Sequence, residues 1–412
     1  MLRFSLPQSF SGLPPHIWLL SAVNFINRCG AMVLCFLTLY LTESLCYPIT
    51  YAGYAMSCYG LGAIAGTFVG GRLVGRWGYQ RVQLWSLLAT GFLLLWVLQV
   101  SRFEWMCVAL FLLNLASESF RPANATAIRE NSNAETFTRS ASLMRMAFNF
   151  AIMFALTLGG WLISYGWHYI FWADIATCWL SALLLWIWIP DPTLAQTAAP
   201  ETSALPSNEV GGGTGAVSPY RDTAFWHFAF CTFLGAFAFM QIVWTVPPFF
   251  KQVYHWNEFT IGVVCAINGL AVMLIEMPLI YRIEQRRPTI WFIRWGIVLY
   301  ALAYLAFTLP ASFKWFAAVF YMLVISVGEI LVMPFSSTWV ARNTSSERQG
   351  DYWAIYGIAY SVANVLAPLV GTQIIDAYGY RVLWYFIVVV CGLAWLGFWR
   401  QSKITTLTPT YA

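Results

Sequence analysis

NSNAETFTRSASLMRMAFNFAIMFALTLGG, residues 131–160, lies without a gap on NTSSERQGDYWAIYGIAYSVANVLAPLVGT, residues 343–372. Six positions in these thirty are identical, among them Ala151 with Ala363 and Gly159 with Gly371. One residue further out of register, Tyr165-Gly166 matches Tyr378-Gly379. The match predicts that the chain is an internal duplication, with one copy in each half.

The composition identifies the environment of these two copies. Hydrophobic residues make up 60% of the 412 positions and charged residues only 9%, against about 25% charged in a typical soluble domain. No soluble core could bury this apolar excess, so we expect a polytopic protein whose main partner is the lipid bilayer. The net charge of +5 is then a property of the loops and gives no reason to expect nucleic acid as a partner.

The same residues argue against metal and cofactor chemistry. The nine cysteines are scattered singly, without a C-x-x-C pair, and the four histidines lie far apart in sequence. No phosphate-binding glycine loop is visible. We therefore expect no metal, no cofactor, no disulfide framework and no ATP-driven step.

Twelve apolar segments are long enough to cross a bilayer, which takes about 20 residues per helix. They cover residues 17–41, 51–71, 82–100, 105–128, 141–163, 169–189, 223–247, 258–281, 289–309, 314–340, 352–375 and 382–400. Between the sixth and seventh lies a stretch rich in Pro, Gly, Ser, Thr and Ala, typical of a flexible linker. The predicted domains are a six-helix bundle at 1–189, a linker at 190–221 and a second six-helix bundle at 222–412.

The basic residues predict an orientation. Fourteen Lys and Arg lie on the side that holds both termini and the linker, four lie on the other side, and four lie within the spans. This imbalance places the termini and the linker in the cytoplasm. We expect a multi-pass protein of the cell (inner) membrane. A parallel six-plus-six repeat is typical of secondary transporters, with the substrate site near the bilayer midplane between the halves.

The chain resembles the major facilitator superfamily along nearly its whole length. The loop after the second span, GGRLVGRWGYQRV, is similar to that superfamily's cytoplasmic signature at Gly71, Arg76, Gly78 and Arg81, although Gly75 stands where the family has Asp. In the family that Asp helps to latch the cytoplasmic side, so latching here is weaker or uses other residues. The resemblance implies an all-α fold of twelve transmembrane helices in two pseudo-symmetric bundles, and transport by alternating access.

Other motifs bear on the branch of the family. FRPANATAI at 120–128, and Gly328, Glu329 and Pro334, are similar to the drug/proton-antiporter-like branch. The exporter signature of the fifth span is only partly present in residues 149–160. The opening span faintly resembles the E-x-x-E-R motif of proton-coupled peptide transporters, but Asn24 and Asn27 replace both acids beside Arg28.

Polar residues in the middle of the spans are the candidate site. In this family spans 1, 4, 7 and 10 line the central cavity, and an ionisable group inside a membrane is by default a functional hypothesis. The candidate substrate-binding residues are Asn24, Asn27, Arg28, Asn114, Arg121, Gln241 and Trp244, with Tyr356 and Tyr360 from a tyrosine stripe on span 11. Glu118 and Glu329 are the candidate proton carriers. The alternative for Arg28 is a fixed salt bridge with Glu118.

Further residues favour structural roles. Gly62, Gly66 and Gly70 form a small-residue face for helix packing, and Asp174 on span 6 is interpreted as structural. The pair Pro247-Pro248 can break or kink its helix.

We therefore expect a monomeric, proton-coupled secondary transporter of a small organic molecule, with a drug or metabolite exporter favoured. The alternative is a proton-coupled importer of an anionic nutrient or siderophore-like compound. A membrane enzyme would need a His/Asp or paired-acid cluster at a membrane boundary, and a sensor would need a large extra-membrane domain. Neither is visible.

Overall fold

The computed structural model describes residues 14–132, 137–188, 222–283, 286–343 and 349–407, which are almost entirely helical and contain no strand. The predicted linker at 190–221 lies outside the described residues. The first half contains α2 (Pro15–Cys29), α3 (Met32–Leu39), the π-helical turn η1 (Tyr40–Ser44), α4 (Ile49–Trp77), α5 (Tyr79–Gln99), α6 (Phe103–Glu130), α7 (Phe137–Ile163) and α8 (Trp167–Trp188). The second contains α10 (Thr223–Trp244), α11 (Val246–Gln252), α12 (Glu258–Ile283), α13 (Thr289–Leu305), the short turns η3 (Ala306–Thr308) and η4 (Ala311–Phe313), α14 (Lys314–Arg342), α15 (Gln349–Tyr378) and α16 (Tyr380–Leu407).

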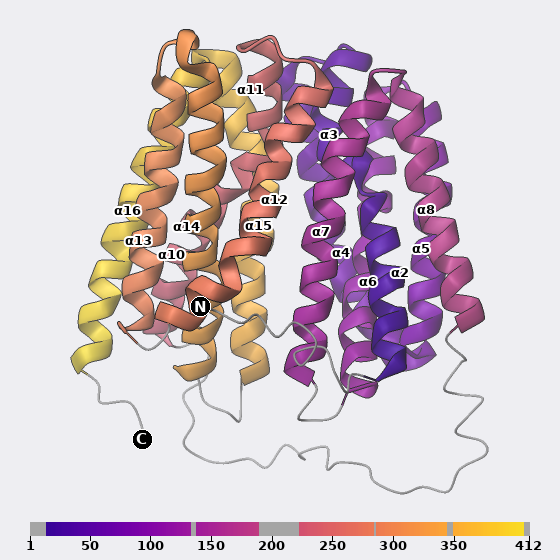
Figure 1. Ribbon diagram of the computed structural model, residues 1–412, viewed down its shortest axis with the longest axis horizontal. Coiled ribbons are helices and arrows are strands. Elements are labelled where there is room, and N and C mark those ends of the chain that lie inside the picture. The colour runs from indigo at the N-terminus through magenta and orange to yellow at the C-terminus, as the bar shows by residue number, and fades with distance from the viewer. Residues whose placement is uncertain (1–13, 133–136, 189–221, 284–285, 344–348, 408–412) are drawn as a thin grey trace, which may run out of the picture.

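These helices confirm the predicted fold class. Within the described residues, eleven helical segments are long and apolar enough to cross a membrane. The remaining span is α4, which is 29 residues long and rich in glycine. Figure 1 shows two bundles side by side, the first half in indigo to magenta and the second in salmon to yellow.

The glycine face of α4 explains how closely two helices of the first bundle pack. A Cβ atom at Gly62 or Gly66 would collide with the carbonyl oxygen of Phe111 or Leu115 on α6. Only glycine permits this approach of one backbone to another, which is the role predicted from the four-residue spacing.

The two halves share backbone features at matching positions, as the predicted duplication requires. Gly166 and Gly379, which the sequence match pairs, have φ values of 147° and 81°, and each follows the fifth span of its half. In addition, the first span of each half is interrupted. Span 1 breaks between α2 and α3 at Gly30 and Ala31, and span 7 breaks between α10 and α11 at Thr245.

The two halves meet near one end of the molecule. We call the end where α8 finishes and α10 begins the linker end. The contacts between α4 and α15 and between α7 and α12 lie away from it: Ser57 Oγ donates a hydrogen bond of 3.0 Å to the carbonyl of Val365, and Gly262 abuts the backbone of Leu156. A second hydrogen bond between the halves, of 3.5 Å from Gln373 Nε2 to the Tyr54 hydroxyl, lies in the same region. The halves are therefore closed against each other at the end opposite the linker, as Figure 1 also shows.

Candidate functional site

Arg28 lies in the last turn of α2, immediately before the break in span 1. The backbone carbonyl of Arg28 accepts a hydrogen bond of 3.1 Å from the N–H of Ala31, which closes the turn. The next helix, α3, starts at Met32 with backbone N–H groups that have no partner in the preceding turn. Asp174 of α8 accepts both, from Met32 at 3.1 Å and from Val33 at 2.9 Å. Arg28 is thus held at a helix end rather than inside a continuous helix.

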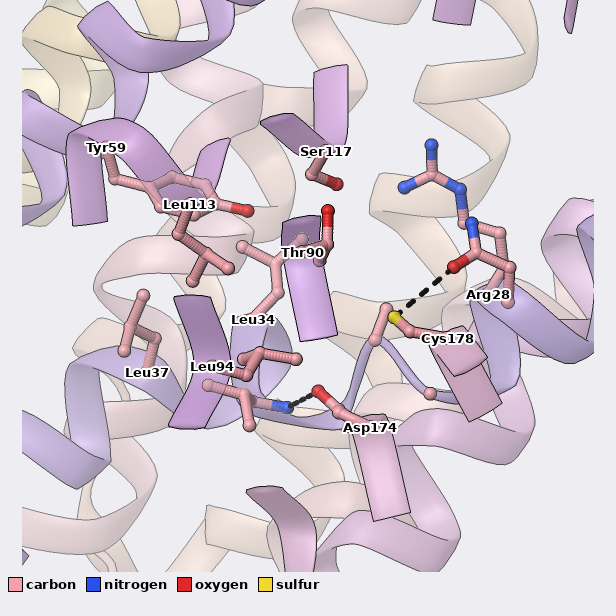
Figure 2. Close-up of a pocket in the computed structure, with 14 residues that line it drawn as sticks. Arg28, Leu34, Leu37, Tyr59, Thr90, Leu94, Leu113, Ser117, Asp174 and Cys178 are labelled. Carbon is pink, nitrogen blue, oxygen red and sulfur yellow. Dashed lines mark hydrogen bonds between the residues drawn. The ribbon is translucent and has the colours of Figure 1, made fainter. Parts of the chain in front are cut away.

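Arg28 lies between two cavities. A small one of about 50 Å³ is lined by residues of α2, α3, α4, α5, α6 and α8, among them Arg28 and Asp174. Figure 2 shows the hydroxyl groups of Tyr59, Thr90 and Ser117 turned toward its middle, with the guanidinium of Arg28 on one side. The cavity is therefore polar on the side that Arg28 occupies.

The larger cavity, of about 210 Å³, lies on the linker side of Arg28. Its polar lining is Asn24, Arg28, Arg121 and Asn124, and its apolar lining is Phe120, Met144 and Phe148. The guanidinium carbon of Arg28 lies 5.3 Å from the centroid of the Phe148 ring, within cation–π range. Two cations, two amides and three apolar side chains therefore surround one space.

One interpretation of Arg28 is a fixed salt bridge with Glu118, and the described part of the chain does not contain this ion pair. Glu118 pairs with Arg121 of its own helix, Nε to Oε2 at 3.0 Å, and in the described residues no ion pair joins Glu118 to Arg28. The predicted fixed salt bridge between spans 1 and 4 is therefore wrong. The two residues of the actual pair are three positions apart, so they reach each other within one turn of α6, and Arg28 remains available.

The Nε atom of Arg28 is buried and makes no hydrogen bond within the described part of the chain. A buried, unpaired guanidinium N–H carries a large desolvation penalty. By contrast, the Arg121 side chain is 69% exposed and that of Glu118 is 12% exposed. Among the described residues that line the two cavities, Arg28 therefore offers a buried, charged donor that has no partner.

Glu329 lies in the other half, on α14, and has a polar neighbour that the sequence analysis did not name. Asn268 of α12 donates from Nδ2 to Glu329 Oε2 at 3.2 Å and to Ser326 Oγ at 2.9 Å. Of the two predicted proton carriers, Glu118 thus pairs with a cation of its own helix, and Glu329 accepts a hydrogen bond from an amide of α12.

Three of the predicted cavity residues instead form hydrogen bonds between neighbouring helices. Asn114 is 3% exposed and donates at 2.8 Å to the carbonyl of Tyr59. Gln241 is fully buried and donates at 3.0 Å to the carbonyl of Ala367. Trp244 is 3% exposed and donates from Nε1 to Asn364 Oδ1 at 3.3 Å. None of the three lines either cavity.

Trp244 also lies beside the first half. Its ring centroid is 6.2 Å from that of Tyr59 on α4, in an edge-on arrangement. Because Tyr59 lines the small cavity, Trp244 lies behind the site, where the two halves meet, rather than in it.

The remaining predicted residues are dispersed. Asn27 lines the small cavity and accepts a weak 3.7 Å contact from the Cys178 thiol. Tyr356 and Tyr360 contact each other through their hydroxyls at 3.5 Å on α15 and do not line the two cavities.

The loop signature lies at the linker end, far along α4 from Tyr59. A Cβ atom at Gly71 would meet nothing within 4 Å, and Arg76 and Arg81 are exposed. Gly78 ends α4 with φ of 80°, a value that favours glycine.

Sequence reasoning missed Asn124, Phe148 and Asn268 and gave Asp174 no partner. Asn124 lies on the face of span 4 that carries Arg121, three positions on, so helical spacing could have found it. Asp174 had only a general signal, a lone acid inside an apolar span, and nothing in the sequence of span 1 predicted the break that it caps.

Two six-helix halves that close against each other at one end, with a polar cavity inside the first half, are the arrangement of a helical membrane transporter. The family model described as Major Facilitator Superfamily matches residues 20–365 and 295–409. The chain belongs to the Major Facilitator Superfamily.

Two relatives described as MFS-type transporters agree with this assignment. The chain is 21% identical over 415 residues to the uncharacterized MFS-type transporter YqjV of Bacillus subtilis (strain 168), covering 97% of both chains. It is 22% identical over 367 residues to YhjO of the same organism, covering 87% of this chain and 86% of that one.

Among solved structures, the nucleoside transporter NupG is similar with a TM-score of 0.77 at 15% identity, covering 94% of this chain and 99% of that one. The peptide transporter POT in complex with sulfate has a TM-score of 0.77 at 13% identity, covering 97% and 96%. These two likenesses concern the fold alone.

Proposed function

We propose that this transporter is a proton-coupled carrier of a small organic anion with an apolar, flat body. The observation that carries the proposal is the buried, unpaired Nε of Arg28 between the two cavities. A carboxylate, sulfonate or phosphate would satisfy that donor, and Arg matches the planar geometry of such groups.

The rest of the larger cavity supports the same substrate class. Arg121 adds a second positive charge, while Asn24 and Asn124 supply neutral donors and acceptors. Phe120, Met144 and Phe148 offer apolar walls, the mixture typical of small-molecule sites. Glu118 balances the charge of Arg121, so the charge of Arg28 remains in excess, and this net positive charge favours the anionic alternative over a cationic drug.

The ion pair on α6 suggests how protons couple to this substrate. An anion that reaches Arg28 and Arg121 competes with Glu118 for the guanidinium of Arg121. Once it loses that cation, Glu118 binds a proton more readily, because an adjacent positive charge favours the ionised carboxylate. Substrate binding and proton binding then favour each other on one helix face.

Glu329 is the second proton carrier in this proposal. Its neutral neighbour Asn268 can hydrogen-bond to either protonation state of the carboxyl group, since an amide both donates and accepts. It therefore does not oppose protonation as a cation would.

Orientation and direction rest on different features. The excess of basic residues favours a cytoplasmic linker end, so the conformation described here would be the inward-facing one. The antiporter-like motifs at 120–128 and around Glu329 favour export. The coupling on α6 favours the opposite direction: because substrate and proton favour each other's binding, they move together, so we favour import of the anion with protons, and the larger cavity would release both into the cytoplasm.

Binding of benzenesulfonate tests the substrate class, because the sulfonate stays ionised and the ring is flat and apolar. Benzenesulfonamide, which is neutral and of the same shape, is the control ligand. We expect calorimetry on purified protein to detect binding of benzenesulfonate, with a Kd of ~1 mM or tighter, which corresponds to about −4 kcal/mol, and to detect no binding of the sulfonamide. Equal binding of both, or of neither, contradicts the anionic class.

Arg28→Ala is the matched variant for this measurement, and Arg76→Ala is its control because Arg76 is exposed at the linker end. We expect Arg28→Ala to weaken benzenesulfonate binding by at least about 30-fold, as expected for loss of a desolvated charge partner. Arg76→Ala should leave the affinity unchanged. An unchanged Kd in Arg28→Ala contradicts the proposal that Arg28 binds the anionic group.

Proton coupling needs a separate experiment. In liposomes that contain a pH-sensitive dye, an imposed benzenesulfonate gradient should drive a proton flux through the wild type. Glu118→Gln and Glu329→Gln keep the side-chain volume and remove the titration. If both variants keep the full substrate-dependent proton flux, neither residue carries the proton.

A further inference from the structure

Asp174 caps the start of α3, immediately after the break in span 1 and four residues beyond Arg28. Its two carboxyl oxygens accept from the backbone N–H groups of Met32 and Val33 at 3.1 and 2.9 Å, and the residue is only 3% exposed. Without these acceptors the first turn of α3 would leave two buried donors unpaired, which is costly away from water. Figure 2 marks one of these two bonds, that from the Val33 N–H, at Asp174 on the edge of the small cavity.

Helix α8 packs against span 1 on both sides of the break. A Cβ atom at Gly30 would collide with the Thr177 side chain. The Cys178 thiol contacts Asn27 Oδ1 at 3.7 Å, and Ser181 Oγ donates to the carbonyl of Val23 at 3.3 Å. Asp174, Thr177 and Cys178 lie within about one turn of α8 and support the end of α2, the turn and the start of α3, whereas Ser181 contacts α2 at Val23, before the break.

Arg28 depends on this support for its place beside the cavities. If α2 continued into α3 without a break, the carbonyl of Arg28 would bond four residues on, and the turn closed by the N–H of Ala31 would disappear. The direction of the α2 end, and with it the start of the Arg28 side chain, would then change. A displacement of about 1 Å is enough to weaken a positioned ionic contact strongly.

We infer that Asp174 is a positioning residue for substrate binding: by capping the broken span 1, it fixes Arg28 between the two cavities. The inference rests on the proposed function insofar as Arg28 binds the substrate. Asp174 itself does not contact the larger cavity, and in the described residues no ion pair joins it to Arg28. Its effect on the substrate therefore passes through the backbone of residues 28–33.

The first test needs no ligand. Phenylglyoxal modifies arginine side chains, and peptide mass spectrometry gives the rate at each arginine. In Asp174→Ala we expect the rate at Arg28 to change by about fivefold or more, the factor that loss of a typical cap contributes to a local equilibrium. The rate at the exposed Arg121 should stay the same. An unchanged rate at Arg28 overturns the inference, whatever the substrate is.

Hydrogen exchange on the same ligand-free protein locates the effect. Peptides covering 29–36 should exchange about fivefold faster in Asp174→Ala than in wild type, while peptides covering 15–27 should not. Ser181→Ala is the matched control, because Ser181 is fully buried on the same helix and bonds to α2 away from the break. Faster exchange throughout α2, α3 and α8 would indicate general destabilisation and contradict a local cap.

The second test uses benzenesulfonate and a double mutant. Asp174→Ala should raise its Kd about tenfold, Asp174→Asn by less, because Asn keeps one acceptor oxygen, and Ser181→Ala not at all. The double variant Asp174→Ala/Arg28→Ala should bind no more weakly than Arg28→Ala alone, because the two residues act through one contact. Fully additive losses would mean that Asp174 acts elsewhere. If the wild type fails to bind the probe, the substrate class is wrong, and the phenylglyoxal result decides the positioning role by itself.

Discussion

The first span of each half is broken, but the two breaks are made in different ways. In span 1 the turn at Gly30 and Ala31 is followed by Met32 and Val33, whose N–H groups need Asp174 as acceptor. In span 7 the turn at Thr245 is followed by Val246-Pro247-Pro248 at the start of α11. Proline has no backbone N–H, so two of the donors that a helix start usually exposes do not exist there.

The difference separates a break that is encoded locally from one that depends on a partner. The prolines of span 7 interrupt the helix wherever the neighbouring helices lie. The break in span 1 depends on a carboxyl group supplied by α8, and it is the break that adjoins Arg28 and both cavities. A change in how α8 packs therefore affects the candidate site. A change around span 7 instead affects the contact between the halves at Trp244.

Gly30→Val should have the largest effect of the changes considered for these breaks. Gly30 has φ of −84°, so the backbone would accept valine, but a Cβ would collide with Thr177. Overpacking of this kind costs about 1–3 kcal/mol. Titration with sodium dodecyl sulfate, followed by tryptophan fluorescence, should give a free energy of unfolding lower by that amount.

The control for Gly30→Val is Gly392→Val, because a Cβ at Gly392 would meet nothing within 4 Å. It should stay close to wild type. A Gly30→Val protein as stable as the Gly392→Val protein would mean that α8 can move away from span 1 at little cost.

The fold was predictable because it depends on long patterns. The twelve apolar segments and the duplication extend over tens of residues, and the glycine spacing on α4 repeats over residues 62–70; the structure agrees with all three patterns. A break was predictable only where its cause is local: the pair Pro247-Pro248 predicts an interruption of its own helix. At Gly30 the cause is a contact with Asp174, 142 residues away from Met32, and no local signal distinguishes that glycine from those that only pack.

The candidate site was predictable in part. Arg28, Asn24 and Arg121 line one cavity as their spans and spacing indicated. The sequence could not tell which polar residues are already bonded: Asn114 and Gln241 have the same residue type and depth as cavity residues, but their amides bond to backbone carbonyls of neighbouring helices. Which amide is free depends on helix rotation, and a single sequence does not determine the rotation of each helix.

The second prediction transfers the span 7 solution to span 1. Asp174→Ala leaves two helix-start donors without acceptors and should lower the free energy of unfolding by about 1–2 kcal/mol. Adding Val33→Pro removes one of those donors and places proline at the position in α3 that Pro247 has in α11. The double variant should therefore recover about half of the loss in the same detergent titration.

Val33→Pro alone is the control for this rescue. In the wild-type background it removes a donor that Asp174 already satisfies, so it should destabilise. If Val33→Pro lowers stability equally with and without Asp174, the carboxyl group does not act as a helix cap.

The third prediction makes the reverse change. Pro247→Ala with Pro248→Ala restores two N–H groups that can bond to carbonyls at the end of α10, so α10 and α11 can join without needing a side-chain acceptor. Loss of proline rigidity in the unfolded chain costs about 0.4–1 kcal/mol per site at most, and the new helical bonds offset part of this. We expect a loss of about 1 kcal/mol or less, with slower hydrogen exchange in peptides covering 244–252. Faster exchange there would show that the break in span 7 is also imposed by its neighbours.

Thr245→Val should have the smallest effect, although it puts the same residue at the second break as Gly30→Val puts at the first. Thr245 is fully buried, and its hydroxyl donates at 3.0 Å to the carbonyl of Gln241. That carbonyl also accepts from the N–H of Thr245 at 3.0 Å, so removal of the hydroxyl leaves no unpaired acceptor. Valine fills nearly the same volume, and the free energy of unfolding should change by no more than about 0.5 kcal/mol. A loss as large as that of Gly30→Val would mean that the span 7 break needs a side-chain contact as much as span 1 does, and the contrast between the two breaks would not hold.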